Sequence, residues 1–134
     1  MIVELGLEAL NDNSYETMRV DPAKVRKIAI ECVSGASNFC WVAEQKGVIV
    51  AAVTALVHDL LFYERKQASV VQFYSRGHSG EGTQLIREFL KWARGRRAIK
   101  LITFTLEPGA DPRIGKLLTR LGLTNHLPMY TEVR

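Results

Sequence analysis

Apolar residues recur along this chain with two different periods, which separate expected helices from expected strands. A helical period runs over residues 22–34, where Asp21 stands at the N-cap position and Pro22 at the first helical position. The period then changes to runs rich in β-branched and aromatic residues, which predict strands over residues 39–44, 48–57 and 68–75. Gly47 is expected to supply the positive φ of a hairpin turn between the first two strands.

The second half of the chain repeats both patterns. A helix is expected after a glycine-rich turn, residues 101–106 alternate like a strand, and Asp111 with Pro112 repeats the helix-start signature. Residues 128–133 are expected to form a final edge strand. The expected order is strand, helix, three strands, helix, strand, helix, strand. This order predicts a mixed α/β fold around one sheet.

Length and composition place the chain among single-domain globular proteins. Its 134 residues, 47% hydrophobic and 24% charged, predict one domain over residues 1–134 and argue against disorder. No apolar run approaches the roughly 18 residues of a membrane span, and the first residues lack a signal-peptide pattern, so we expect a cytoplasmic protein without a membrane partner. Cys32 and Cys40 predict no disulfide framework, and three scattered histidines predict no metal site.

The formal net charge of +4 points to an anionic partner, either nucleic acid or a phosphate-bearing cofactor. Basic residues gather at positions 94, 96, 97 and 100, where they also suit the cationic end of a helix. Binding of nucleic acid would need aromatic residues interleaved with this run, and Trp92 is the only aromatic residue close by. The pattern therefore argues against nucleic acid.

The glycine-rich turn, residues 76–83, is the most informative segment. A strand that ends in such a turn and opens a helix leaves backbone N–H groups aimed at one point, which favours phosphate. Glycines at positions 77, 80 and 82 let an anion approach the amides, and Ser79 and Thr83 add hydroxyl donors. The alternative is a tight connection whose glycines serve backbone geometry alone. The turn matches neither a Walker A motif nor a Rossmann turn, because no Gly-Lys-Ser/Thr follows and a hairpin precedes it.

The segment around this turn resembles a known family. Residues 70–86 are similar to the fourth strand, acetyl-CoA loop and following helix of the GNAT N-acetyltransferase superfamily, with Gly80 and Gly82 at the loop's two glycine positions. Residues 41–51 resemble that family's second and third strands, and residues 111–123 resemble its segment Asn-x-x-Ala-x-x-Leu-Tyr-Glu-Lys-Leu-Gly-Phe. The likeness implies a GNAT-like central sheet, mixed but mostly antiparallel, with helices on both faces.

The resemblance also implies an activity: acetyl transfer from acetyl-CoA to an amine by direct attack in a ternary complex. Backbone groups of the strand at residues 68–75 would contact the thioester and pantetheine, and amides of residues 77–83 would hold the pyrophosphate. Arg87, Lys91 or Arg94 would approach the 3′-phosphate of CoA. The implied cofactor-binding residues are Phe73, Tyr74, Ser75, Arg76, Gly77, His78, Ser79, Gly80, Glu81, Gly82, Thr83 and Asp111.

The chain departs from the family pattern at two positions. Gly77 stands where the family's loop has Arg or Gln, and Arg76 lies one residue early. Leu118 stands where many members have the tyrosine that protonates the departing thiolate. The compact size and the helix end over residues 89–94 are similar to small phage- and prophage-encoded members.

Four residues are candidates for moving protons, namely His58, Glu64, Tyr74 and Tyr130. Each has a plainer alternative: an exposed histidine, a solvated loop carboxylate, or a tyrosine that only packs. The acceptor stays open between a small-molecule amine and a protein amine, and Met129 to Val133 is the candidate edge for a homodimer. The alternative function is a GNAT-like module that binds CoA or a protein without turnover.

Overall fold

The computed structural model describes residues 21–34, 38–76, 80–106, 110–125, 130 and 132. Within these residues, four strands form one sheet in the order β1-β2-β3-β4. The elements in chain order are α2 (Pro22–Ser34), β1 (Phe39–Gln45), β2 (Val48–Asp59), β3 (Lys66–Ser75), α3 (Gly80–Arg94), β4 (Ile99–Phe104) and α4 (Pro112–Arg120). Neighbouring strands from β1 to β3 are antiparallel, and β3 and β4 are parallel. The predicted mixed, mostly antiparallel sheet is confirmed.

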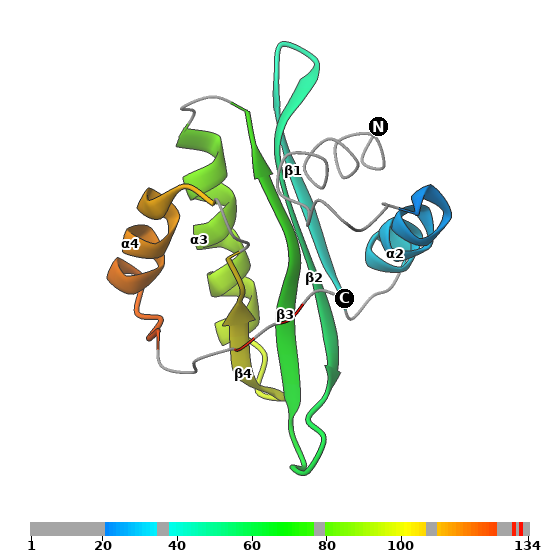
Figure 1. Cartoon of the computed structure of the whole chain (residues 1–134), viewed down its shortest axis with the longest axis vertical. Coiled ribbons are helices and arrows are strands. Elements are labelled where there is room, and N and C mark those ends of the chain that lie inside the picture. The colour runs from blue at the N-terminus through cyan, green and yellow to red at the C-terminus, as the bar shows by residue number, and fades with distance from the viewer. Residues whose placement is uncertain are drawn as a thin grey trace.

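Helices cover both sides of this sheet, as Figure 1 shows. Helices α3 and α4 lie on one side and α2 lies on the other, against β1 and β2. In the described part of the chain, no helix is long and apolar enough to cross a membrane. The strand expected before α2 falls within residues 1–20, outside the described residues. Of the expected strand 128–133, only Tyr130 and Glu132 are described, and neither lies in a strand.

Local signals in the sequence placed the helix starts and the hairpin turn correctly. The carboxylate of Asp21 accepts a hydrogen bond from the backbone N–H of Ala23 at 3.0 Å, as an N-cap residue does. The turn between β1 and β2 has positive φ at both Lys46 (53°) and Gly47 (79°). Two consecutive positive φ values match the twist of a two-residue hairpin.

The main core lies between α3 and the sheet. Helix α3 buries its apolar face against alternate residues of β1, β2 and β3. Phe39 is 1% exposed and stacks its ring edge-to-face with Phe89, at 5.4 Å between ring centroids. Aromatic pairs of this geometry add to the stabilisation from buried apolar area. This packing fixes α3 against the sheet.

An extra residue in β3 changes which side chains face α3. Thr54 pairs with Gln72 and Ala55 with Val70, so Val71 has no partner in the ladder. Such a β-bulge bends a strand and re-aims the side chains beyond it. Val70 packs in the core under α3, Phe73 packs against that core, and Tyr74 packs in a second cluster with Ile49.

Strands β3 and β4 separate part-way along their length. Their pairing runs from Lys66 with Ile99 to Val70 with Phe104, where β4 ends. Strand β3 continues to Ser75. Beyond the last pair, the rings of Phe73 and Phe104 lie edge-to-face with centroids 5.8 Å apart. The end of β3 therefore extends beyond its parallel neighbour, beside the start of α3.

Candidate cofactor and catalytic site

The end of β3 and the start of α3 form one continuous feature. The backbone N–H of Arg76 donates to the carbonyl of Val50 at 2.7 Å, which ties the strand end to β2. Helix α3 then begins at Gly80. Gly77, His78 and Ser79 lie outside the described residues, so their predicted phosphate contacts stay predictions.

The two described glycines of the turn have different surroundings. A Cβ at Gly80 would have no heavy atom within 4 Å, whereas a Cβ at Gly82 would lie 2.8 Å from Ser75 Oγ and 3.2 Å from Phe73 Cζ. Gly82 is thus required for the close approach of α3 to β3. Gly80 leaves open space at the first turn of the helix, where backbone N–H groups and the helix dipole favour an anion.

Charged groups of both signs stand near this helix start. Arg76 is exposed, and Glu81 is half-buried in the first turn. A cation favours a phosphate here, while the Glu81 carboxylate competes with it for the helix N-terminus. An anion bound here therefore depends mainly on uncharged backbone amides and on Arg76.

The three predicted backbone-contact residues lie where β3 runs past β4. The positions of Phe73 and Ser75 place their side chains against α3, near Gly82. Tyr74 packs on the other face of the sheet, with Ile49 and Ala52. The family resemblance implies that this stretch of β3 contacts pantetheine.

The four proton-transfer candidates are not gathered in one place. His58 lies at the end of β2 opposite Gln67, and Tyr74 pairs with Ala52. Position 58 lies six positions along β2 from Ala52, which corresponds to about 20 Å at the usual strand rise. Tyr130 is 92% exposed. Glu64 is exposed in the connection between β2 and β3, at the opposite end of β3 from Ser75.

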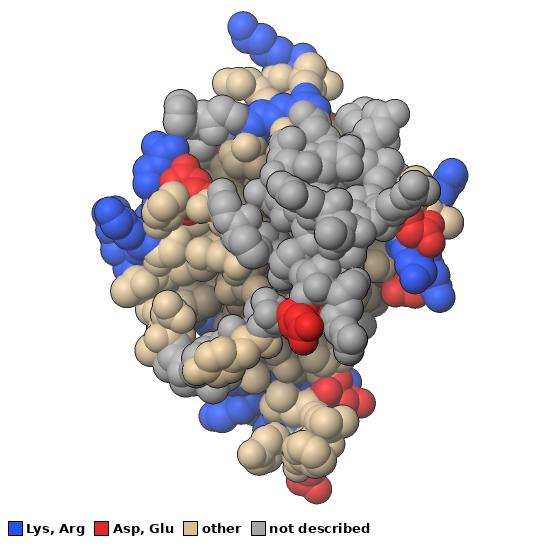
Figure 2. All heavy atoms as spheres, viewed as in Figure 1, with Lys and Arg blue, Asp and Glu red and all other residues tan. Residues whose placement is uncertain are grey.

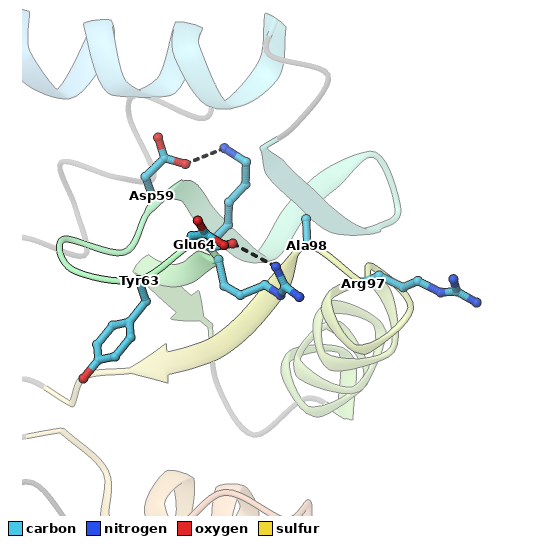
Figure 3. Close-up of a pocket in the computed structure, with 7 residues that line it drawn as sticks. Asp59, Tyr63, Glu64, Arg97 and Ala98 are labelled. Carbon is cyan, nitrogen blue, oxygen red and sulfur yellow. Dashed lines mark hydrogen bonds and ion pairs between the residues drawn. The ribbon is translucent and has the colours of Figure 1, made fainter.

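Glu64 lines a surface hollow of about 600 Å³ with Asp59, Tyr63, Arg65, Lys66, Arg97 and Ala98 (Figure 3). Asp59 and Lys66 point toward each other and form an ion pair at 2.8 Å. This hydrogen bond and the Lys66 charge lower the pKa of Asp59. The side chain of Arg97 points away from this pair. The hollow lies near the C-terminal end of α3 and far from Gly80, so it is separate from the glycine turn.

Helix α4 carries two of the positions discussed for the family segment. Asp111 caps the helix by accepting from the N–H of Arg113 at 2.9 Å, and it forms an ion pair with the same arginine at 2.6 Å. Leu118 is buried in the core with 6% exposure. Leu118, which the sequence resemblance aligns with the family's tyrosine, is therefore an apolar core residue that donates no proton.

Arg94 and Cys40 take structural positions. Arg94 donates from Nη2 to the carbonyl of Leu121 at 2.6 Å, which joins the end of α3 to the end of α4. Burial raises the pKa of the Cys40 thiol, which disfavours the thiolate that a nucleophile needs. No group of three or more His, Cys, Asp and Glu residues suited to a metal ion occurs in the described part of the chain.

One face of the molecule shows how some of the described basic side chains are distributed. On the face that Figure 2 shows, described Lys and Arg residues lie around the rim, with Asp and Glu between several of them. Arg96 lies over the ring of Trp92, with 4.5 Å from its guanidinium carbon to the ring centroid. This side of the described surface has no basic track of the kind that follows a nucleic-acid backbone.

Sequence reasoning missed three polar residues that meet across β3 and β4. Gln67 Nε2 donates to Thr103 Oγ1 at 2.9 Å, and Thr103 Oγ1 donates to Ser69 Oγ at 3.0 Å. The Ser69 hydroxyl lies 3.0 Å from Nε2 of His58. In the sequence, these three residues are visible only as polar residues in or next to segments that are expected to be strands. Their meeting depends on the pairing of strands that lie far apart in the sequence.

No family model matches the sequence, and no curated protein matches it. Solved structures do match its fold. A predicted acetyltransferase from Clostridium acetobutylicum, crystallised with acetyl-CoA, has a TM-score of 0.75 at 15% identity, over 99% of this chain and 87% of that one. The aminoglycoside acetyltransferase meta-AAC0020 from an uncultured soil metagenomic sample, in complex with sisomicin, has a TM-score of 0.63 at 14% identity, over 99% and 86%.

A third match carries a different description. A transcriptional regulator from Bacillus halodurans C-125 has a TM-score of 0.72 at 19% identity, over 98% of this chain and 93% of that one. At these identities the matches are matches of fold. The chain has a GNAT-like fold, similar to acetyltransferases over nearly its whole length.

Proposed function

We propose that this chain is an N-acetyltransferase, which transfers the acetyl group of acetyl-CoA to a primary amine by direct attack in a ternary complex. One observation carries the proposal. Strand β3 continues past the end of β4 to Ser75, and α3 then begins at Gly80, where a Cβ would meet no atom within 4 Å. A long thioester with a diphosphate fits such a place, with its acyl end between the strands and its phosphates at the helix.

The proposed contacts follow from this arrangement. The backbone of Phe73, Tyr74 and Ser75 contacts pantetheine, and backbone N–H groups of β3 polarise the thioester carbonyl. The pyrophosphate takes the amides of residues 77–83 and the Arg76 charge. Asp111 stays a predicted cofactor-binding residue, although its carboxylate already caps α4 and pairs with Arg113.

The proposed reaction also needs residues that accept and donate protons. A primary amine has a pKa near 10, so it must lose a proton before attack near neutral pH. His58, Glu64, Tyr74 and Tyr130 remain the proposed carriers. Because Leu118 donates no proton, the departing thiolate must take its proton from elsewhere, such as the attacking nitrogen or water.

The proposed acceptor is a small-molecule or protein amine. The neighbour crystallised with sisomicin, an aminoglycoside, supports the small-molecule class. A homodimer through residues 129–133, a cytoplasmic location and kinship with phage-encoded members stay expectations from the sequence.

A second function is favoured by one observation. Leu118 is buried at the position of the family's proton donor. A GNAT-like module that binds acetyl-CoA or a protein without turnover would need no donor there. The neighbour described as a transcriptional regulator has a similar fold.

Calorimetric titration with acetyl-CoA, followed by a thiol-release assay over a panel of primary amines, separates these functions. Thiol release with an amine supports the transferase, whereas binding without release for any amine supports the module. Gly80→Asp is expected to weaken acetyl-CoA binding at least tenfold, because it places a carboxylate beside the phosphates. Gly80→Ala is the matched control and is expected to bind nearly as wild type. Equal affinity of both variants would contradict the proposed phosphate site.

A further inference from the structure

Four polar side chains form one hydrogen-bonded network across β2, β3 and β4. Thr103 Oγ1 accepts from Gln67 Nε2 at 2.9 Å and lies 3.0 Å from Ser69 Oγ, which lies 3.0 Å from His58 Nε2. The ring nitrogen Nδ1 of His58 lies 3.3 Å from the backbone carbonyl of Asp59. Each link joins a hydrogen-bond donor to an acceptor.

The groups at the two ends of this hydrogen-bonded network fix the direction in which its hydroxyl protons point. The Gln67 amide nitrogen only donates, so Thr103 accepts from it and its own proton is free to point to Ser69. The carbonyl of Asp59 only accepts, so the neutral His58 ring carries its proton on Nδ1 and accepts on Nε2. The Ser69 proton then points to His58. All hydroxyl protons are therefore oriented from Thr103 toward His58.

The Thr103 side of this network lies where β3 and β4 separate. Ser69 pairs with Thr103, and only the pair of Val70 with Phe104 follows before β4 ends. Ala68 and Val70 are buried beneath α3, so strand alternation places Ser69 on the opposite face. Thr103 and Ser69 thus border the point of separation, on the face from which an amine can reach a thioester whose CoA lies toward α3.

His58 lies at the other end of the hydrogen-bonded network. It is exposed, about 10 Å along β2 from Ala55, the residue that pairs with Val70. At that distance its ring does not reach the separation point directly. The hydroxyls of Ser69 and Thr103 span the gap. Among the described residues, Asp59 on β2 and Lys66 on β3 are the charged neighbours of His58 along the paired strands, and they pair with each other at 2.8 Å.

We propose that Thr103 and Ser69 relay the proton of the acceptor amine to His58, which is the terminal proton acceptor of the acetyl transfer. The inference rests on the proposed function. The ammonium gives a proton to Thr103 Oγ1 as the Thr103 proton passes to Ser69 and the Ser69 proton passes to His58 Nε2. The neutral amine then attacks the thioester carbon, and the carbon–sulfur bond breaks. The second nitrogen proton goes to the thiolate, and exposed His58 releases its proton to water.

Variants of the two hydroxyl residues test the relay in the full-length protein. Ser69→Ala and Thr103→Val are expected to lower kcat by about 10²-fold, in the range for a lost acid–base group. Thr103→Ser keeps the hydroxyl and is expected to keep most of the activity. Calorimetric affinity for acetyl-CoA is expected to stay within about twofold of wild type in all three, since the phosphate site is elsewhere. His58→Gln is expected to lower kcat to a similar extent, because it removes the terminal proton acceptor.

Acceptor amines of graded pKa separate proton transfer from a general structural effect. An amine that is already neutral at the assay pH needs no relay, so the defects of Ser69→Ala and Thr103→Val are expected to shrink as the acceptor pKa falls. A merely structural defect would be the same for every amine.

Two outcomes overturn the proposal in different ways. The relay alone is overturned if the wild-type protein acetylates an amine and the Ser69→Ala and Thr103→Val variants keep its kcat and pH profile. The relay alone is also overturned if the kcat defect of these variants is equal for all amines. A wild-type protein that binds acetyl-CoA but releases no thiol with any amine overturns the proposed function, and the relay with it.

Discussion

Helix α3 approaches β3 so closely at Gly82 that a Cβ there would lie 2.8 Å from the hydroxyl oxygen of Ser75. This contact sets the start of α3 directly beside the end of the strand. The contact between Gly82 and Ser75 thus brings the open space at Gly80 close to the extended edge of β3. The same glycine-rich turn therefore contains one glycine that packs and one that leaves room.

Substitution of these two glycines by alanine should have different effects on stability. Gly82→Ala is expected to lower the free energy of unfolding by about 1–3 kcal/mol, because an overpacked contact must be relieved by a shift of α3 or β3. Gly80→Ala is expected to change it by less than about 0.5 kcal/mol, as at other exposed positions. Urea denaturation followed by circular dichroism measures both. Equal stability of the two variants would show that α3 does not pack on Ser75 as described.

Leu118 should act as a core residue. Leu118→Ala is expected to destabilise the protein by about 2–5 kcal/mol, since it leaves a cavity beneath α4. Lys116→Ala, on the exposed face of the same helix, serves as the control and is expected to have an effect within about 0.5 kcal/mol. Thermal and urea unfolding measure the difference, and a Leu118→Ala protein as stable as wild type would place this residue outside the core.

Asp111 should stabilise α4 chiefly as its N-cap. Asp111→Ala is expected to lower the free energy of unfolding by about 0.5–2 kcal/mol, because the N–H of Arg113 loses its partner. Asp111→Asn keeps a good capping group and removes the ion pair with Arg113. We expect the asparagine variant to retain most of the stability, because exposed ion pairs contribute little. A loss in Asp111→Asn as large as in Asp111→Ala would instead assign the effect to the ion pair.

The ion pair of Asp59 with Lys66 predicts a small dependence of stability on pH. The pKa of Asp59 is lowered in the folded protein by the hydrogen bond and charge of Lys66. The contribution is therefore fully present above the unfolded-state pKa, about 3.9 for aspartate, and is lost as the pH falls through the lower folded pKa. Asp59→Asn is expected to reduce Tm slightly at neutral pH and low salt, with the difference from wild type closing below about pH 4. A difference that persists in acid or in high salt would point to a cause other than this charge pair.

Much of the secondary structure could be predicted because its determinants are local. Asp21 and Asp111 cap their helices through N–H groups two residues away, and Gly47 adopts the positive φ that its turn requires. The strand ends were less accurate. Strand β2 extends to Asp59 and β3 begins at Lys66, because His58 pairs with Gln67 and Asp59 with Lys66 across a hairpin. Strand β4 begins and ends two residues earlier than expected, at Ile99 and Phe104.

By itself, the sequence determined the mixed α/β class, the helix that follows the glycine-rich turn, and the absence of a tyrosine at position 118. These properties depend on residue identity and short-range periodicity. Only the tertiary structure decided that Val71 forms a bulge, that β4 ends before β3, and that Ser69 meets Thr103 and His58. The physical reason is that hydrogen bonds between strands join residues distant in sequence. Thr103 lies 34 positions from Ser69 along the chain, yet their hydroxyl oxygens are 3.0 Å apart.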